Sequence, residues 1–251
     1  MSEETKSPAS YATPIAIILA GVVIAGAIFY GEVQEPKSAK TNILANQVLI
    51  DNFEPVTKTD NIAGNPNGEL TIIEYSDLEC PFCKVFHLTM NDLIAERSDI
   101  RWVYRHFPLS ELHAKATTEA VASECARVQG GNNIFWQYID QIFTITTSND
   151  GLDLAILPEI ASTLGLDVTA FNTCLTEEQT LTKVLSDYDD AIAIGADGTP
   201  FVIATYKDGT PIAIFKAMQD GSINEADPVI QDLASDINRL YVKNIEALSG
   251  Q

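Results

Sequence analysis

The sequence predicts an α/β domain with an inserted block of helices, preceded by one membrane-spanning helix. A β-branched and aromatic run at residues 70–75 gives way at Cys80 to an amphipathic helical pattern, and a second strand pattern follows at residues 100–107. A strand, a helix and a strand in this order form a parallel βαβ unit. Only helical patterns occur between about residue 108 and residue 194, before two more strand patterns and a closing helix.

Two cysteines, Cys80 and Cys83, lie where the first predicted strand ends and the helix begins. Unpaired backbone N–H groups and the helix dipole stabilise an anion there, and Pro81 suits the first helical turn. A stabilised thiolate makes the pair a redox centre, because the thiolate is the reactive form. A half zinc site is one alternative, but the sequence lacks the second CxxC or histidine pair that it needs. A purely structural bridge is the other, and it would close almost no loop. We expect no metal and no cofactor.

Composition limits the partners of the chain. Thirty-five acidic residues against 15 basic ones give a formal net charge of −20, which argues against nucleic acid and anionic lipid surfaces as partners of the folded part. The simplest interpretation is a well-solvated acidic surface. Four cysteines fit two disulfides in an oxidising compartment, although the number alone does not decide this.

Composition and hydropathy predict a polar tail (1–14), a transmembrane anchor (15–31) and a linker (32–60) before the domain at 61–251. A cleaved signal peptide is the alternative, since the small residues 25–27 could form a peptidase site. Against it, Glu3 and Glu4 precede the apolar run, where a signal peptide carries positive charge. We therefore expect a retained single-pass anchor in the cell membrane. Lysines flank both sides of the span almost equally, so only the redox argument places the domain outside the cytoplasm.

The remaining elements follow from periodicity and turn signals. Residues 64–68 form a turn cluster before the first strand, and Gly130–Gly131 ends the first inserted helix. An Asp-Gly turn joins the last two strands into a hairpin. The expected helices are 111–129, 134–143, 152–164 with a break at Pro158, 168–175, 177–194 and 225–248, and the expected late strands are 201–206 and 211–215.

The ordered set of motifs resembles the DsbA-like thiol:disulfide oxidoreductases of the thioredoxin superfamily. The resemblance covers roughly residue 61 to the end, and its matching segments are Glu-Tyr-Ser-Asp at 74–77, Cys-Pro-Phe-Cys at 80–83, Tyr-Arg-His-Phe-Pro-Leu at 104–109 and Gly-Ala-Asp-Gly-Thr-Pro at 195–200. It implies a thioredoxin-like fold with a helical insertion at about 108–194.

The resemblance also implies a role for each site residue. Cys80 would be the nucleophile and Cys83 the resolving cysteine. Pro200 would be a cis-proline facing the pair, with Thr199 offering backbone groups to an extended substrate; an ordinary trans turn is the alternative. Glu74 would be a buried acid that relays the proton of the second thiol, unless it faces solvent at a sheet edge.

Four further expectations concern other residues of the domain. Cys125 and Cys174 resemble positions that are bridged in some members of the family; two buried free thiols are the alternative. Phe82 stands where the best-known oxidant of the family has histidine, so we expect a weaker oxidant than that protein. Asp77 and Glu79 should raise the thiol pKa. The three histidines, with no metal-binding spacing, are expected in packing or surface roles, with His87 able to face solvent.

The expected function is therefore an extracytoplasmic enzyme that introduces or exchanges disulfides in extended or unfolded cysteine-containing proteins. The family implies a quinone-linked membrane partner that reoxidises the pair. A reductase or isomerase of the same fold is one alternative, and a module that binds thiol partners without turnover is another.

Overall fold

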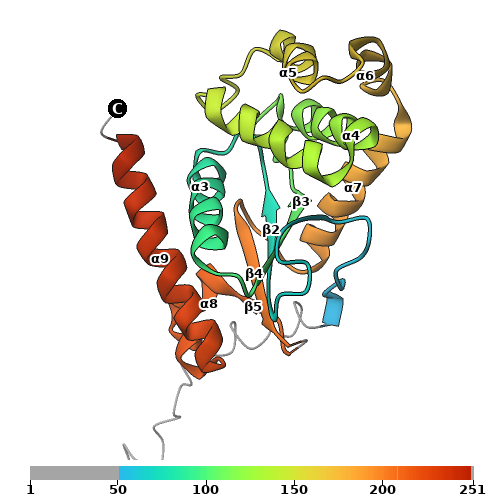
Figure 1. Ribbon diagram of the computed structural model, residues 1–251. Helices are drawn as coiled ribbons and strands as arrows, with labels where there is room; N and C mark the ends of the chain where they lie inside the picture. Colours follow the sequence, from blue (N-terminus) through green and yellow to red (C-terminus); the bar gives the residue numbers. More distant parts are fainter. Residues whose placement is uncertain (1–50, 208, 250–251) are drawn as a thin grey trace, which may run out of the picture. The chain divides into compact units, whose positions relative to one another are not determined.

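The computed structural model describes residues 51–207 and 209–249 (Figure 1). The predictions for the polar tail, the anchor and most of the linker fall on residues outside these ranges and stay predictions. Within the described ranges, none of the helices combines the length and the apolar character that a bilayer crossing needs.

The core of the domain is a five-stranded mixed sheet with the strand order β1-β3-β2-β4-β5. Strands β2 (Leu70–Ser76) and β3 (Ile100–His106) are parallel, as the predicted βαβ unit requires. The flanking pairs are antiparallel, with β4 (Phe201–Tyr206) beside β2. Because β2 is central, its side chains are buried on both faces and its carboxyl end opens directly toward Cys80.

An edge strand, β1 (Asn61–Gly64), pairs antiparallel with β3 and was missed in the sequence interpretation, which expected only a turn from residue 64. Its four residues carry little strand propensity. Tertiary contacts hold it instead, because the Asn132 side chain bonds both the N–H and the carbonyl of Ile62.

Helices cover both faces of the sheet. Helix α3 and helix α9 pack against each other on one face, and α7 lies on the other, beside β3 (Figure 1). The block between β3 and β4 is helical throughout its regular structure, as predicted. The helices are α3 (Pro81–Glu96), α4 (Ala116–Ile145), α5 (Leu157–Thr163), α6 (Val168–Cys174), α7 (Glu178–Ala193), α8 (Ile214–Asp220) and α9 (Pro228–Ser249), with 3-10 turns at Leu154–Ile156 and Ser222–Glu225.

Four predicted boundaries were wrong. The segment predicted as helix from residue 152 begins as a 3-10 turn at Leu154–Ile156, and α5 starts at Leu157, so the break lies before Pro158 rather than at it. Helix α4 begins at Ala116 rather than at residue 111, although its two halves do separate at Gly131, whose φ of 74° favours glycine. The last strand, β5, covers only Ile212–Ala213, because residues 214 and 215 turn into α8 and Phe215 packs edge-on against Phe86. The closing helix begins at Pro228, after a 3-10 turn.

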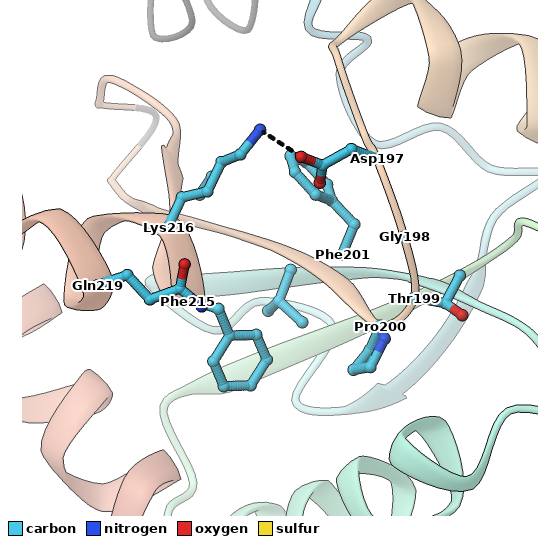
Figure 2. A pocket seen from close by; sticks show the side chains of 10 residues that line it. Asp197, Gly198, Thr199, Pro200, Phe201, Phe215, Lys216 and Gln219 are labelled. Atoms are coloured by element: carbon cyan, nitrogen blue, oxygen red, sulfur yellow. Dashed lines mark ion pairs between the residues drawn. The ribbon is translucent and has the colours of Figure 1, made fainter. Parts of the chain in front are cut away.

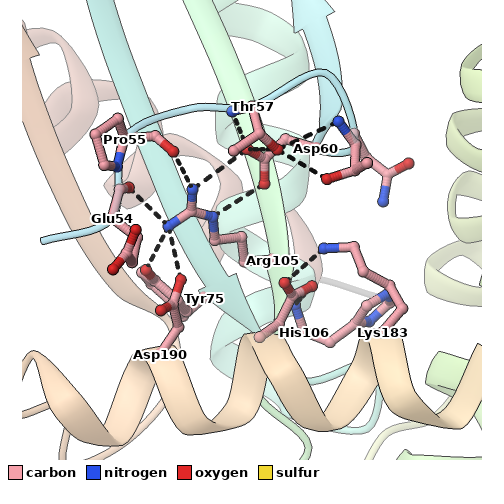
Figure 3. Close-up of polar contacts among 12 residues, drawn as sticks. Glu54, Pro55, Thr57, Asp60, Tyr75, Arg105, His106, Lys183 and Asp190 are labelled. Carbon is pink, nitrogen blue, oxygen red and sulfur yellow. Dashed lines mark hydrogen bonds and ion pairs between the residues drawn. The ribbon is translucent and has the colours of Figure 1, made fainter.

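A buried arginine fastens the segment before β1 to the sheet (Figure 3). Arg105 is 2% exposed and forms an ion pair with Asp60 at 3.0 Å. It also donates to the Tyr75 hydroxyl and to the carbonyl oxygens of Glu54 and Pro55, and it pairs with Asp190 of α7 at 3.1 Å. One guanidinium therefore joins the entering segment, the central strand and α7.

Candidate active site

Cys80 is the N-cap residue of α3 and lies four residues beyond the end of β2. Its φ of −77° and ψ of 123° are extended, and Pro81 follows within the first helical turn. No side chain caps this helix end. The free N–H groups of the first turn are therefore available to the Cys80 sulfur, as the sequence predicts.

The Thr199–Pro200 peptide bond is cis, as expected, and it lies against the cysteine pair. The Sγ atom of Cys80 is 3.4 Å from the Thr199 carbonyl oxygen. Residues separated by more than 100 positions in sequence thus meet at one point, directly before β4.

The surroundings of Cys80 lower its pKa to about 6. The hydrogen bond from the Cys83 thiol contributes most; burial opposes it, and hydrogen bonds from the Thr199 side chain and from the N–H groups of Cys83 and Phe82 add to it. The net shift is downward despite the acidic residues of the preceding loop. The Asp77 carboxylate accepts hydrogen bonds from the Glu79 N–H at 2.7 Å and the Leu109 N–H at 2.8 Å.

Cys83 and Glu74 lie beneath the nucleophile, fully buried. Burial raises the pKa of Cys83 well above its ordinary value, and the charge of Cys80 adds to this. Burial likewise raises the pKa of Glu74 to about 8, although hydrogen bonds from Ser76 and Trp102 oppose the shift. Glu74 therefore does not face solvent, and it can hold a proton at neutral pH close to both sulfurs.

Sequence reasoning missed the importance of His113. It is 7% exposed, and its Nδ1 lies 2.9 Å from the Asp77 carboxylate. Burial lowers its pKa, but the hydrogen bond and charge of Asp77, with the charge of Cys80, outweigh burial and raise it. The site therefore includes a titratable imidazole at His113, paired with Asp77, that Phe82 cannot supply. The signal was its place just after β3, whose carboxyl end adjoins that of β2.

The other two histidines are packed in the interior. His87 is 1% exposed, so the expectation that it could face solvent was wrong, and its ring contacts Trp102 and Phe143. His106 lies 3.1 Å from Glu124 in a buried pair. Among the described residues, no group of histidine, cysteine or acidic side chains is arranged to hold a metal.

A pocket of about 230 Å³ adjoins the cis-proline (Figure 2). Pro200 and Phe215 form part of its wall, and Lys216 pairs with Asp197 at 3.5 Å beside it. Phe82, between the two cysteines, is 60% exposed. An exposed apolar side chain thus stands between the two cysteines, and a small pocket lies beside the cis-proline that faces them.

The predicted second disulfide is present. Cys125 of α4 and Cys174 of α6 are bonded across 49 residues, whereas Cys80 and Cys83 are free thiols. The bond joins two helices of the inserted block and takes no part in the site around Cys80.

A family model described as thioredoxin matches residues 56–212. The chain belongs to the thioredoxin family. This match covers the CxxC turn, the inserted helices and the cis-proline together.

Curated relatives of this thioredoxin-family chain are named Na(+)/H(+) antiporters. One from Salinispora tropica is 30% identical over 65% of this chain, and one from Mycolicibacterium gilvum is 32% identical over 59%. The chain spans about a quarter of the length of these relatives, 24% in both cases.

Solved structures with this thioredoxin-like fold are DsbA proteins and similar enzymes. DsbA2 of Pseudomonas aeruginosa is 27% identical, with a TM-score of 0.55 over 66% of this chain and 96% of that one. Alpha-DsbA1 of Wolbachia pipientis shares the fold at 23% identity, with a TM-score of 0.55 over 81% and 99% of the two chains. The chain therefore shares its family, its fold and a pair of free thiols with thiol-disulfide oxidoreductases.

Proposed function

We propose that this protein introduces or exchanges disulfides in extended or unfolded cysteine-containing proteins, through Cys80 and Cys83, outside the cytoplasm. The observation that carries the proposal is the difference between the two thiols. Cys80 has a pKa lowered to about 6 beside a cis-proline, while the pKa of the buried Cys83 is raised. Cys80 is therefore a good leaving group as a thiolate, whereas Cys83 is stable only as the protonated thiol.

Oxidation of a substrate proceeds in two exchanges. In the oxidised enzyme a substrate thiolate attacks the Cys80 sulfur, the Cys80–Cys83 bond breaks, and Cys83 leaves with the electron pair. Glu74 gives Cys83 its proton. A second substrate thiolate then attacks the substrate sulfur of the mixed disulfide and releases Cys80 as a thiolate. The substrate has lost two electrons, and the enzyme holds a thiolate at Cys80 and a thiol at Cys83, with Glu74 left to take up a proton from solvent.

The substrate would lie along Thr199 and Pro200, with a side chain in the adjoining pocket. Residues 15–31 would anchor the enzyme by a single span in the cell membrane, and a quinone-linked membrane partner would reoxidise the pair. An oxidising compartment is supported by the Cys125–Cys174 disulfide, since such bonds persist mainly outside the cytoplasm. A reductase or an isomerase would use the same site. Measuring the reduction potential of the cysteine pair distinguishes these activities from oxidation of substrates.

The Cys83→Ser variant tests the exchange. Without Cys83, a mixed disulfide formed at Cys80 has no resolving thiol within the enzyme. Incubation with an oxidised cysteine peptide should therefore leave a covalent adduct that non-reducing mass spectrometry detects and dithiothreitol removes.

The double variant Cys80→Ser/Cys83→Ser is the matched control and should form no adduct. If Cys83→Ser remains unmodified while the wild type still binds the peptide, the chain is a thiol-binding module without turnover, and the proposed function is wrong.

A further inference from the structure

A loop with left-handed backbone conformation lies against the CxxC turn. It makes hydrogen bonds to the residue before the turn and to the residue after it. Three consecutive non-glycine residues, Ser148, Asn149 and Asp150, have φ values of 62°, 53° and 62°. Such a conformation is costly for residues with a side chain, and it persists only where the surroundings fix it. The next residue is Gly151, where a Cβ atom would lie 2.7 Å from the Ser148 carbonyl oxygen.

Contacts to the residues that flank the cysteines fix this loop. On one side, Glu79, which directly precedes Cys80, accepts the Asn149 N–H at its carbonyl oxygen at 2.8 Å. On the other side, Lys84, which directly follows Cys83, donates to the Thr146 carbonyl oxygen at 2.7 Å. Residues 146–152 therefore form a brace across the redox turn.

Glu79 holds this brace with both its backbone and its side chain. Its side chain is fully buried, and its two carboxylate oxygens accept the N–H groups of Gly151 at 3.1 Å and Leu152 at 3.2 Å. Its own N–H donates to Asp77 at 2.7 Å. Backbone and side chain of the residue before the nucleophile are thus both fixed, so the position of Glu79 sets the position of Cys80.

Glu119 faces Glu79 from α4. It is also fully buried, and neither of its carboxyl oxygens has a hydrogen-bond donor among the described residues. The Glu79 carboxylate is the charged group that acts most strongly on it. Two buried carboxyl groups in contact cannot both be charged, and one proton between them forms an O–H···O bond. The proton belongs on Glu119, because Glu79 already accepts two N–H groups.

We propose that Glu79 and Glu119 share one proton and act as positioning residues for Cys80, holding the left-handed brace against the redox turn. The inference rests on the proposed function for its effect on exchange, whereas the shared proton is independent of it. Raising the pH should remove this proton, drive the two carboxylates apart and free the brace.

The charged surroundings of Glu119 agree with a proton held at neutral pH. Burial raises its pKa to about 9, and the hydrogen bond and charge of Glu79 add to this, whereas Lys115 opposes it. Lys115 itself is turned to the brace, donating to the carbonyl oxygens of Asp150 and Leu152. The titratable groups that face Glu119 or its neighbours are Glu79, Asp77, Lys115, Tyr138, His113 and Asp150.

Carbon-detected NMR between pH 6 and pH 10.5 tests this, because it tolerates fast amide exchange. In the reduced wild type, the Glu119 carboxyl carbon should titrate near pH 9, and the backbone carbons of residues 147–152 should shift with the same midpoint. In Glu119→Gln, whose amide donates permanently to Glu79, the loop shifts should disappear. The exposed Glu159→Gln variant is the matched control and should retain them.

A second measurement follows Cys80 itself. The rate of its alkylation by iodoacetamide should rise as Cys80 ionises around pH 6 and change again near pH 9 in the wild type, and the change near pH 9 should be absent in Glu119→Gln. A Glu119 carboxyl that titrates below pH 6, or a loop that ignores its titration, overturns the inference. Absence of peptide exchange with these signals intact refutes the proposed function instead.

Discussion

At the residue scale, the buried acid Glu74 makes the folding stability depend on pH. Its pKa is raised from 4.5 to about 8 by burial, so the folded protein keeps a proton that the unfolded chain has already lost between these values. Folding stability from this group is therefore complete below pH 4.5 and declines as the pH rises toward 8, by at most about 1.4 kcal/mol per pH unit.

We expect Glu74→Gln to flatten this decline. Urea unfolding of the oxidised form at pH 5 and pH 8 measures it, since the two cysteines do not titrate in that form. The variant should be more stable than the wild type at pH 8, and its Cys83 should accept a proton more slowly during exchange. Equal pH dependence in both proteins would mean that Glu74 is ionised in the folded state.

Much of the site could be predicted at this scale, and the exceptions share a cause. Cys80 and Cys83 lie at one strand-to-helix junction, so their redox role follows from local pattern, whereas the buried position of Glu74 was expected from the family resemblance. His113 acts through Asp77, and Glu119 acts through Glu79. These residues come together only in the folded chain. Charge compensation between distant segments leaves no periodic signal in a sequence.

At the scale of elements, the Arg105 cluster fixes the entering segment to β3 and α7. Arg105→Leu would leave Asp60 charged and buried at 6% exposure. Breaking a buried pair in this way costs about 3–5 kcal/mol, which we expect as loss of unfolding free energy in urea.

Arg101→Leu, on the same strand, is the matched control. Arg101 is half-buried and donates to the Thr71 hydroxyl, so its loss should cost only about 1 kcal/mol. The double variant Asp60→Leu/Arg105→Leu should recover part of the larger loss, because the fully buried carboxylate of Asp60 is then gone and only the partly exposed Asp190 has lost its partner. A loss at Arg105 no larger than at Arg101 would contradict the assigned role.

Elements with strong periodicity were predicted, and those made by tertiary pairing were not. Helices α6 and α7 match their predicted ranges to within a residue at each end. Strand β1 forms because β3 and Asn132 supply its hydrogen bonds. Residues 214 and 215 look like strand in sequence, but packing of Phe215 against Phe86 and Tyr241 places them in a helix.

At the scale of the whole molecule, the Cys125–Cys174 disulfide supports the inserted block without touching the redox turn. A bond across 49 residues should contribute about 4 kcal/mol in the chain-entropy model. We expect Cys125→Ala/Cys174→Ala to lose this amount in urea unfolding while Cys80 alkylates at the wild-type rate. Free Cys125 in the purified protein, found by mass mapping after alkylation, would contradict the pairing.

The accessibility of the redox turn has a consequence for timing. Cys80 is only 5% exposed, whereas Phe82 next to it is 60% exposed. A thiol can approach such a sulfur only on a narrow, protruding stretch of chain. Under the proposed function, a client cysteine is then processed before its own tertiary structure closes over it, so the order in which a client collapses would decide which of its pairs are formed.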